Sequence, residues 1–309
     1  MKMYLGLTKR NMLVYFKDRQ AILFSLLTSI IVFVLYLLFL RNTFVDAINQ
    51  ALAEMPMIRE LVRDEDLEMF TNAKLLVGII GSAAITIPFS CLRTVTSDRE
   101  TRVDQDILAT PVSRGQIVLA YFTASALSAI VMTSVILTAG LVILQLQGNL
   151  YLGLGGVLAT YGVTALGCVS ATALFMNVVL FFRSGSASGA FFGILSAVSG
   201  FVIGAYIPVS QFSGGVRTVC NLFPASHITI LLRNALLGGV LGHIDGGIGG
   251  LDRGEFVQVL KDVFTFKADM FGSSLNTTAM LSFVLAIFAL SLIVMVPTDR
   301  HTTPQDSGI

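Results

Sequence analysis

The residues best suited to specific chemistry lie in one polar segment, from Arg93 to Gly115. Ser97 is followed three residues later by Glu100, a spacing in which hydroxyl and carboxylate can bind the free N–H groups at a helix start. Asp98 and Glu100 would then stand in the first turn, where the helix dipole favours acidic side chains. The pattern predicts a helix that begins at Ser97 and projects two acids outward from its first turn.

The same segment carries signals for its own end. Thr110-Pro111 should end the helix, because the residue before a proline avoids helical dihedral angles. Ser113 with Gln116 repeats the capping pattern and should start the next helix. We therefore expect a compact helix of about three turns, tied to two longer helices by tight turns. A rigid element of this kind could transmit a push, although a solvated connector would fit these residues equally well.

The rest of the chain offers little for catalysis. No G-x-x-x-x-G-K-[ST] sequence occurs, which excludes phosphate binding in the P-loop manner. The run Gly185-Ser186-Ala187-Ser188-Gly189 has alanine where a nucleophile would stand, and no apolar segment supplies a histidine base. Cys91, Cys168 and Cys220 lack metal-ligand spacing and are interpreted as apolar fillers. We expect no catalytic residue, no metal and no cofactor in this chain.

The elements that must position the polar segment are apolar. Six stretches contain no Asp, Glu, Lys or Arg, namely Ala21–Leu40, Leu75–Leu92, Gln116–Leu144, Leu152–Phe182, Ala187–Pro208 and Ala279–Pro297. A hydrocarbon core roughly 30 Å thick needs about 20 apolar residues, so each can cross a bilayer. The chain is 54% hydrophobic and 13% charged, with a mean hydropathy of +0.80. The sequence predicts an all-α integral membrane protein with six transmembrane helices, in a single domain over residues 1–309.

Charge predicts the orientation. Lys and Arg are concentrated before the first span, between spans two and three, and after span four, whereas the connection after span one is mainly acidic. By the positive-inside rule both termini and the polar segment should face the cytoplasm. The net charge of +1 and the lack of a Lys/Arg-rich run give no reason to expect a nucleic-acid partner.

Three groups of residues point to a known family. They are Ser97-Asp98-Arg99-Glu100-Thr101-Arg102 with Asp106-Ile107-Leu108-Ala109-Thr110-Pro111-Val112-Ser113-Arg114; Ile207-Pro208-Val209-Ser210 with Asn221-Leu222-Phe223-Pro224-Ala225-Ser226-His227 and Leu232-Arg233; and Lys9-Arg10-Asn11 to Phe16-Lys17-Asp18-Arg19. The first group resembles the cytoplasmic loop of type-2 ABC transporter permeases, and the others resemble the turn after span five and the N-terminal helix of that family. One departure is Arg102-Val103-Asp104-Gln105, where the family usually has a Glu-x-Gly-Thr-like sequence.

The resemblance implies a permease subunit of a drug- or antibiotic-exporter-like system in the bacterial cell membrane. It implies an N-terminal interfacial helix, a cytoplasmic coupling helix between spans two and three, and an external re-entrant or interfacial hairpin between spans five and six. Two permease subunits, identical or paralogous, would join two ABC ATP-binding subunits, which would bind the ATP and Mg. The ATPase-coupling residues would be Asp98, Arg99, Glu100, Arg102, Ile107, Leu108, Pro111 and Arg114.

The resemblance also places the substrate route near spans two and five. Small and polar candidates for this route, or for the interface between permeases, are Thr86, Ser90, Ser196, Ser199, Gly200, Gly204 and Tyr206. Span five also carries small residues at spacing four: Gly185, Gly189, Gly193 and Ala197. Such a stripe packs within one subunit or faces a partner or pathway. Because the spans are uncharged, the expected substrate is amphipathic or lipid-like, such as a drug, an antibiotic, a peptide or a lipid.

The apolar segment after span five is not expected to cross the membrane as a seventh span. Phe223–Leu237 is apolar, contains Pro224 and ends at Gly238-Gly239, which indicates an interfacial or re-entrant helix. The glycine-rich run Gly242–Gly254 indicates a flexible external loop.

Two other functions stay open on the residues alone. An ion-coupled secondary transporter usually places ionisable groups within its spans, and the six stretches contain none, although backbone carbonyls could still hold sodium. A membrane scaffold that transports nothing would have the same composition.

Overall fold

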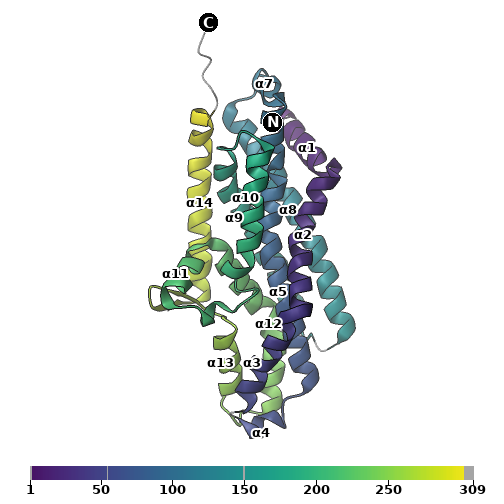
Figure 1. Cartoon of the computed structure of the whole chain (residues 1–309), viewed down its shortest axis with the longest axis vertical. Coiled ribbons are helices and arrows are strands. Elements are labelled where there is room, and N and C mark those ends of the chain that lie inside the picture. The colour runs from purple at the N-terminus through teal and green to yellow at the C-terminus, as the bar shows by residue number, and fades with distance from the viewer. Residues whose placement is uncertain (1, 54, 149, 303–309) are drawn as a thin grey trace.

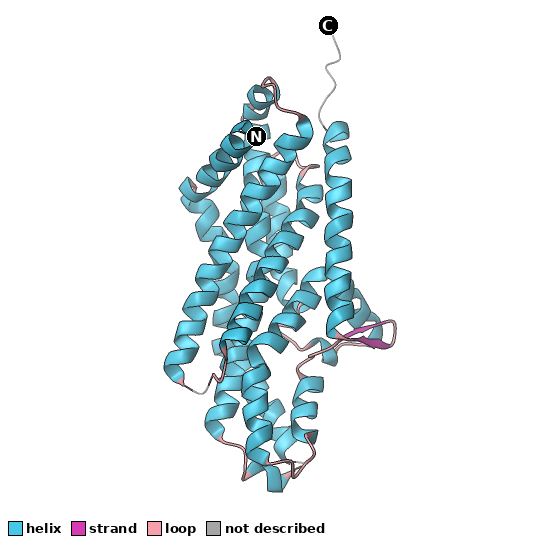
Figure 2. Cartoon of the chain, turned by 180° about the vertical axis from the view of Figure 1, so that it is seen from behind, coloured by secondary structure: helices cyan, strands magenta, loops and turns pink. Residues whose placement is uncertain are grey.

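The computed structural model describes residues 2–53, 55–148 and 150–302, and Figures 1 and 2 show an elongated, almost wholly helical molecule. In chain order the elements are α1 (Lys2–Lys17), α2 (Arg19–Leu35), the π-helical turn η1 (Tyr36–Leu40), α3 (Arg41–Ala53), α4 (Pro56–Arg59), α5 (Asp64–Cys91), α6 (Arg93–Glu100), α7 (Val103–Leu108), α8 (Arg114–Gln147), α9 (Leu154–Val179), α10 (Gly185–Val202), the 3₁₀ turn η2 (Val209–Gln211), α11 (Gly214–Leu222), α12 (Pro224–Ile248), α13 (Glu255–Val263), β1 (Ala268–Met270), β2 (Ser273–Leu275) and α14 (Thr277–Thr302). The two strands pair antiparallel, with Ala268 opposite Leu275.

Helix α5 is the centre of the molecule and packs against α2, α8, α9 and α12. It is buried on nearly all sides because its residues are apolar all round and several are small. A β-carbon on Gly78 would lie 3.2 Å from the Ala205 side chain, and one on Gly81 would lie 2.6 Å from the Thr229 hydroxyl. Gly81 lets α12 approach α5 closely, which is how helices associate in lipid, and Gly78 makes room for the turn after α10.

The two ends of the molecule differ. One end, here the loop end, contains α1, α6, α7 and the last turns of α14 (Figure 1). The opposite end, here the far end, contains α3, α4, α13 and the end of α12 (Figure 1). The N-terminal helix and the end of α14 therefore lie at the same end as residues 93–115. Residues 303–309, the C-terminal end that is expected to face the cytoplasm, lie outside the described residues.

The described part contains six helices that are long and apolar enough to cross a membrane, namely α5 with α6, α8, α9, α10, α12 and α14. Helices α1 and α2 meet this test only as a pair, bent by 72°. The prediction of an all-α integral membrane fold is confirmed. Three of the predicted spans match α8, α9 and α14 to within a few residues at each end, and a fourth matches the second half of α5. The first predicted span is α2 with η1, and it continues without a break into α3.

Two boundaries differ from the sequence prediction. Helix α10 ends at Val202 rather than at Pro208, because Gly204 has a φ of +68° and the N–H groups of Ala205 and Tyr206 both donate to Gly200 O. Helix α5 starts at Asp64, well before the predicted span. Lys74 therefore lies inside this central helix, where its side chain is buried. The Lys74 ammonium lies 3.6 Å from the centre of the Phe44 ring, a cation–π contact that replaces some of its hydration.

The segment after α10 was predicted incorrectly in part. Helix α12 does not end at Gly238-Gly239, and residues 242–248 are helical rather than a flexible loop. The glycines are tolerated because Leu236, Val240 and Ile244 bury one face of the helix against its neighbours. Helix α12 begins near the level of α11 and ends at the far end, so it does not run the length of the molecule (Figure 1).

The polar segment also differs from its prediction. No helix begins at Ser97; α6 follows α5 almost directly, starts at Arg93 and contains Ser97 in its middle. The chain then turns at Arg102, whose φ is +61°, and the separate short helix α7 starts at Val103. The prediction at Ser113 is confirmed, since its hydroxyl accepts the Gln116 N–H at 3.4 Å at the start of α8.

Candidate coupling site and pathway

Asp98 lies inside the subunit rather than in the cytoplasm, so the expectation that it projects outward is wrong. Only about 4% of Asp98 is exposed. Its carboxylate accepts two hydrogen bonds from the Arg10 guanidinium, one of them at 2.8 Å from Nη2, and a third at 2.5 Å from the Tyr121 hydroxyl. These bonds raise the pKa of Arg10, which therefore stays charged. Asp98 thus joins α6 to α1 and to α8.

The two neighbours of Asp98 join α6 to the connection between α9 and α10. The Arg99 guanidinium donates to Leu180 O at the end of α9 and, at 3.4 Å, to Phe182 O. The Glu100 carboxylate accepts the Gly185 N–H at 3.1 Å, at the first turn of α10. Both contacts satisfy backbone groups that a helix end leaves unpaired. Through three consecutive side chains α6 is bonded to α1, α8, α9 and α10.

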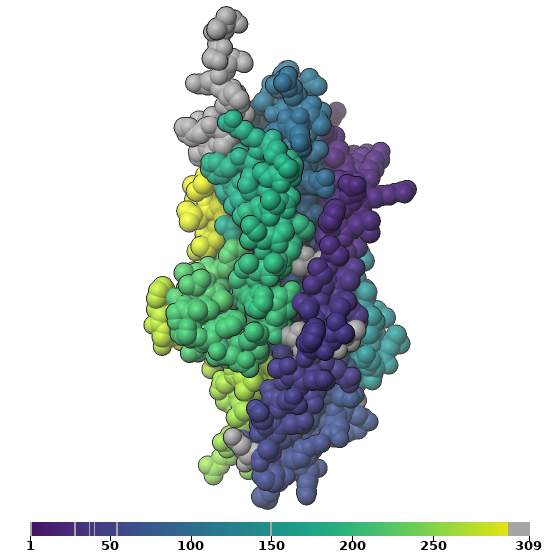
Figure 3. Space-filling view, in the orientation of Figure 1, coloured from purple at the N-terminus to yellow at the C-terminus, as the bar shows by residue number. Residues whose placement is uncertain are grey.

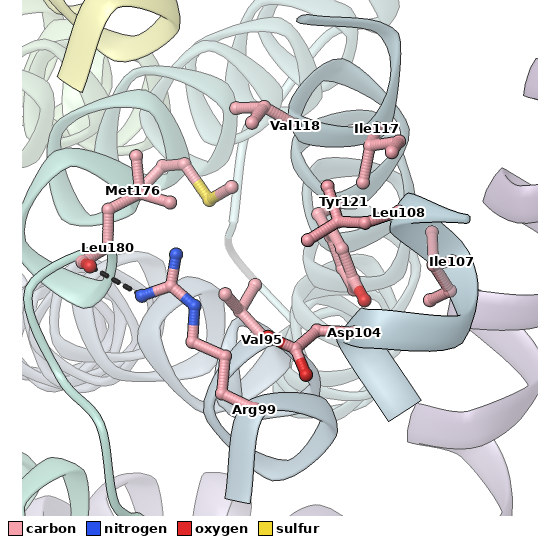
Figure 4. Close-up of a pocket in the computed structure, with 10 residues that line it drawn as sticks. All are labelled: Val95, Arg99, Asp104, Ile107, Leu108, Ile117, Val118, Tyr121, Met176 and Leu180. Carbon is pink, nitrogen blue, oxygen red and sulfur yellow. Dashed lines mark hydrogen bonds between the residues drawn. The ribbon is translucent and has the colours of Figure 1, made fainter. Parts of the chain in front are cut away.

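Helix α7 is held to the same frame by apolar contacts. Ile107 is buried, Leu108 is half-buried, and both line a small cavity of about 40 Å³ between α6, α7, α8 and α9 (Figure 4). The other walls include Val95, Ile117 and Met176 (Figure 4). The apolar side chains of α7 therefore point into the subunit and fix the position of the helix.

The remaining predicted coupling residues lie on the outer surface of the loop end. Arg102, Pro111 and Arg114 are exposed, as are Gln105 and Asp106 of α7. These residues and Glu100 belong to the exposed surface of residues 93–115, which also includes Arg93, Ser97, Thr101 and Thr110. Its pattern of both charge signs suits specific docking rather than general attraction to an acidic or basic partner.

An apolar groove of about 760 Å³ separates α2 and η1 from α10 and the turn that follows α10. Phe24, Leu27, Ile31, Leu35 and Phe39 form one wall, and Gly189, Phe192, Gly193, Ser196, Ala197, Phe201, Tyr206 and Ile207 form the other. Figure 3 shows this face, with α2 and α10 on either side of it. The volume and the mainly apolar lining are typical of a site for a small molecule. A smaller cavity of about 220 Å³ continues toward the loop end and is lined by Ser90 and Arg93.

The structure places only some of the predicted pathway residues at this groove. Ser196 and Tyr206 line it, and Ser90 lines the smaller cavity while donating to Ala21 O.

The other predicted pathway residues do not line the groove. Thr86 and Ser199 are buried and donate to carbonyls of their own helices. Gly200 makes room for the Tyr206 ring, and Gly204 forms the turn after α10.

Several residues that complete the site were not singled out from the sequence. Tyr121 was not noted, and Arg10 was noted only as part of the N-terminal helix; their contacts with Asp98 span 23 and 88 residues, which no local pattern reveals. The apolar wall of α2 did carry a signal, since positions 24, 27, 31, 35 and 39 recur at helical spacing. In an apolar span, however, every face has similar residues, so that stripe does not stand out. The glycine stripe of α10 faces the groove, and added β-carbons at Gly189 and Gly193 would meet open space.

The helices define a multi-pass membrane subunit with an exposed polar surface at the loop end. Residues 47–296 match the family model described as ABC-2 family transporter protein, and no curated protein matches the chain. Because the family match covers most of the chain, the chain belongs to this family. It is a membrane permease subunit of an ABC transporter, and such subunits associate with an ABC ATP-binding subunit.

Proposed function

We propose that the chain exports an amphipathic or lipid-like substrate, such as a drug, an antibiotic, a peptide or a lipid, along the groove between α2 and α10. The observation that carries this proposal is the set of direct bonds from α6 to α1, α8, α9 and α10. A displacement of α6 by a partner would act on all four helices, and on α9 and α10 at their ends. One of them, α10, forms a wall of the groove.

The groove supports the class of substrate. Its lining is almost wholly aliphatic and aromatic, with Ser196 and Tyr206 as the polar side chains. A molecule with a large apolar part and a few hydrogen-bonding groups would match this lining, whereas a strongly ionic molecule would lose its hydration there without compensation.

The assembly that we propose has two permeases, identical or paralogous, and two ATP-binding subunits in the bacterial cell membrane. The ATP-binding subunits supply the ATP and Mg sites and dock at the exposed part of the loop end, formed by Glu100, Arg102, Pro111 and Arg114. The basic residues of the short connections favour a cytoplasmic position for the loop end.

The test is a double variant, Arg99→Ala with Glu100→Ala, assembled with its ATPase partner. It removes the bonds from α6 to the ends of α9 and α10. We expect normal membrane insertion, a sharp fall in transport, and ATP hydrolysis that drops or no longer depends on substrate. Glu255→Ala, which removes an exposed acid of α13 at the far end, is the control and should transport normally. If the double variant assembles and transports at the normal rate, residues 93–115 are only a connector.

A further inference from the structure

The groove does not end in an apolar wall on its loop-end side. The adjoining cavity of about 220 Å³, here the end compartment, shares the wall residues Phe24, Gly189 and Phe192 with the groove. The two spaces are therefore one continuous site, with a wide apolar part and a smaller end. The end compartment differs from the groove in its polar side chains, which are those of Ser90, Arg93 and Ser188.

Arg93 brings a positive charge to the end compartment without a negative one beside it. Its guanidinium, which is always protonated, has no hydrogen bond or ion pair with any residue in the described part of the chain. The two acids that follow it on α6 are bonded elsewhere, since Asp98 pairs with Arg10 and Glu100 accepts the Gly185 N–H. Of the described residues that line the groove and the end compartment, Arg93 alone is charged.

Ser188 provides a second, independent sign of a missing partner. This residue of α10 is only 4% exposed, yet its hydroxyl has no hydrogen bond to the residues that the structure describes. Buried hydroxyls are normally hydrogen-bonded. The neighbouring Ser90 follows that rule, because its hydroxyl donates to Ala21 O at 3.2 Å. The end compartment is thus lined by two groups of donors, the Ser188 hydroxyl and the Arg93 guanidinium, that lack an acceptor.

The chemistry of the missing acceptor follows from these donors. Carboxylate and phosphate groups only accept hydrogen bonds when ionised, and they bind a guanidinium through two parallel hydrogen bonds that are roughly twice as strong as neutral ones. A neutral hydroxyl group would bind Arg93 more weakly, and an ammonium group would be repelled by it. The apolar groove that opens from the end compartment calls for an apolar part on the same molecule.

We propose that the substrate is an amphipathic anion whose acidic group binds Arg93 and Ser188 in the end compartment while its apolar part occupies the groove. This assignment rests on the proposed export along the groove and narrows its substrate class. The charge of the ligand is then met at one point only, so the rest of the groove can stay apolar. Arg93 selects acidic amphiphiles over neutral and cationic ones of the same shape.

The chain contains no tryptophan, so a single fluorophore can report on the groove. Ile31→Trp places it in the groove wall of the full chain, reconstituted in phosphatidylcholine nanodiscs. The probes are dodecyl phosphate and dodecanol, each with bromine on the last carbon, because bromine quenches tryptophan at close range. Ile293→Trp, 70% exposed on α14, measures the amount of each probe in the lipid. After this correction the phosphate should quench Ile31→Trp at about tenfold lower concentration than the alcohol.

Three substitutions in the Ile31→Trp background assign that preference to its donors. Arg93→Gln keeps much of the side chain but removes the charge, and should abolish the preference for phosphate. Ser188→Ala should reduce it severalfold, because one donor is lost. The matched control is Arg183→Gln, which removes an exposed charge at the loop end that lines neither space and should keep the full preference.

The possible failures are distinct. An unchanged preference in Arg93→Gln, or an equal loss in Arg183→Gln, would overturn the proposal. Equal quenching of Ile31→Trp by phosphate and alcohol would also overturn it, but would leave export along the groove standing. If neither probe quenched Ile31→Trp while both quenched Ile293→Trp, the groove would not take up amphiphiles, and both this proposal and the proposed route would be wrong.

Discussion

At the scale of single residues, the buried carboxylate of Asp98 is the contact on which the loop end depends. It accepts three hydrogen bonds, two from the half-buried Arg10 guanidinium and one from the Tyr121 hydroxyl. A buried charge pair adds little compared with an apolar pair, but removing one member leaves the other without its partner. The position of α6 against α1 and α8 therefore depends on this one side chain.

Asp98→Ala should lower the free energy of unfolding by about 2–3 kcal/mol, because Arg10 and Tyr121 lose a charged acceptor. The measurement is thermal unfolding of the purified subunit in mild detergent. Asp106→Ala, an exposed acid on the adjacent helix α7, should leave the unfolding temperature unchanged. Equal stability of the two variants would show that the Arg10–Asp98 contact does not hold the loop end together.

At the scale of elements, two adjacent glycines of α12 differ in how closely the rest of the molecule packs against them. A β-carbon on Gly239 would lie 2.1 Å from the backbone oxygen of Tyr151, whereas one on Gly238 would meet nothing within 4 Å. Gly239→Ala should cost about 1–3 kcal/mol, because backbone atoms must move apart. Gly238→Ala should be neutral or stabilise the helix by up to about 1 kcal/mol. Chemical or thermal unfolding of the two variants decides this, and a neutral Gly239→Ala would mean that α12 is not seated against Tyr151.

The groove gives a second prediction at this scale. Gly193→Phe directs a large side chain from α10 into open space that faces α2. Transport should fall by roughly an order of magnitude, the loss that a penalty of about 1.4 kcal/mol on substrate binding produces. Gly162→Phe, on an exposed part of α9 with the same open space, is the matched control. Normal transport by Gly193→Phe, with normal assembly, would place the pathway elsewhere.

The sequence predicts some of the helices correctly and others incorrectly, for physical reasons. Long uncharged runs located α5, α8, α9 and α14, because the thickness of the bilayer fixes their length and composition. Glycine content misled the prediction for α12, since its glycines lie in a helix stabilised by packing rather than by propensity. The Ser97–Glu100 pattern led to a wrong prediction for α6. This helix follows α5 almost directly, so no helix begins at Ser97 and no N-terminal N–H groups are there to be capped. Residues 98–100 were predicted from the sequence as functional residues. Their contacts with Arg10, Tyr121 and Gly185 were not, because those partners are distant in the sequence and are brought close only by the fold.

At the scale of the whole molecule, the structure brings α1, residues 93–115 and the end of α14 to one end (Figure 1). The expected orientation places that end in the cytoplasm. In a variant lacking Cys91, Cys168 and Cys220, a new cysteine at Leu251 should react with an impermeant reagent added to intact cells. A new cysteine at Gln105 should react only after the membrane is opened. The reverse pattern of labelling would invert the topology.

The central hypothesis is that this chain provides the membrane pathway while a separate ATP-binding subunit hydrolyses ATP. ATP hydrolysis tests it most directly. The chain has no P-loop sequence, and its family consists of permease subunits. The measurement compares ATP binding and hydrolysis by the purified chain in nanodiscs with those of the same chain assembled with its ABC ATPase. We predict that the chain alone shows neither, and that hydrolysis coupled to substrate appears only in the assembly and is lost with Arg99→Ala and Glu100→Ala together. Tight ATP binding or hydrolysis by the isolated chain would contradict the account.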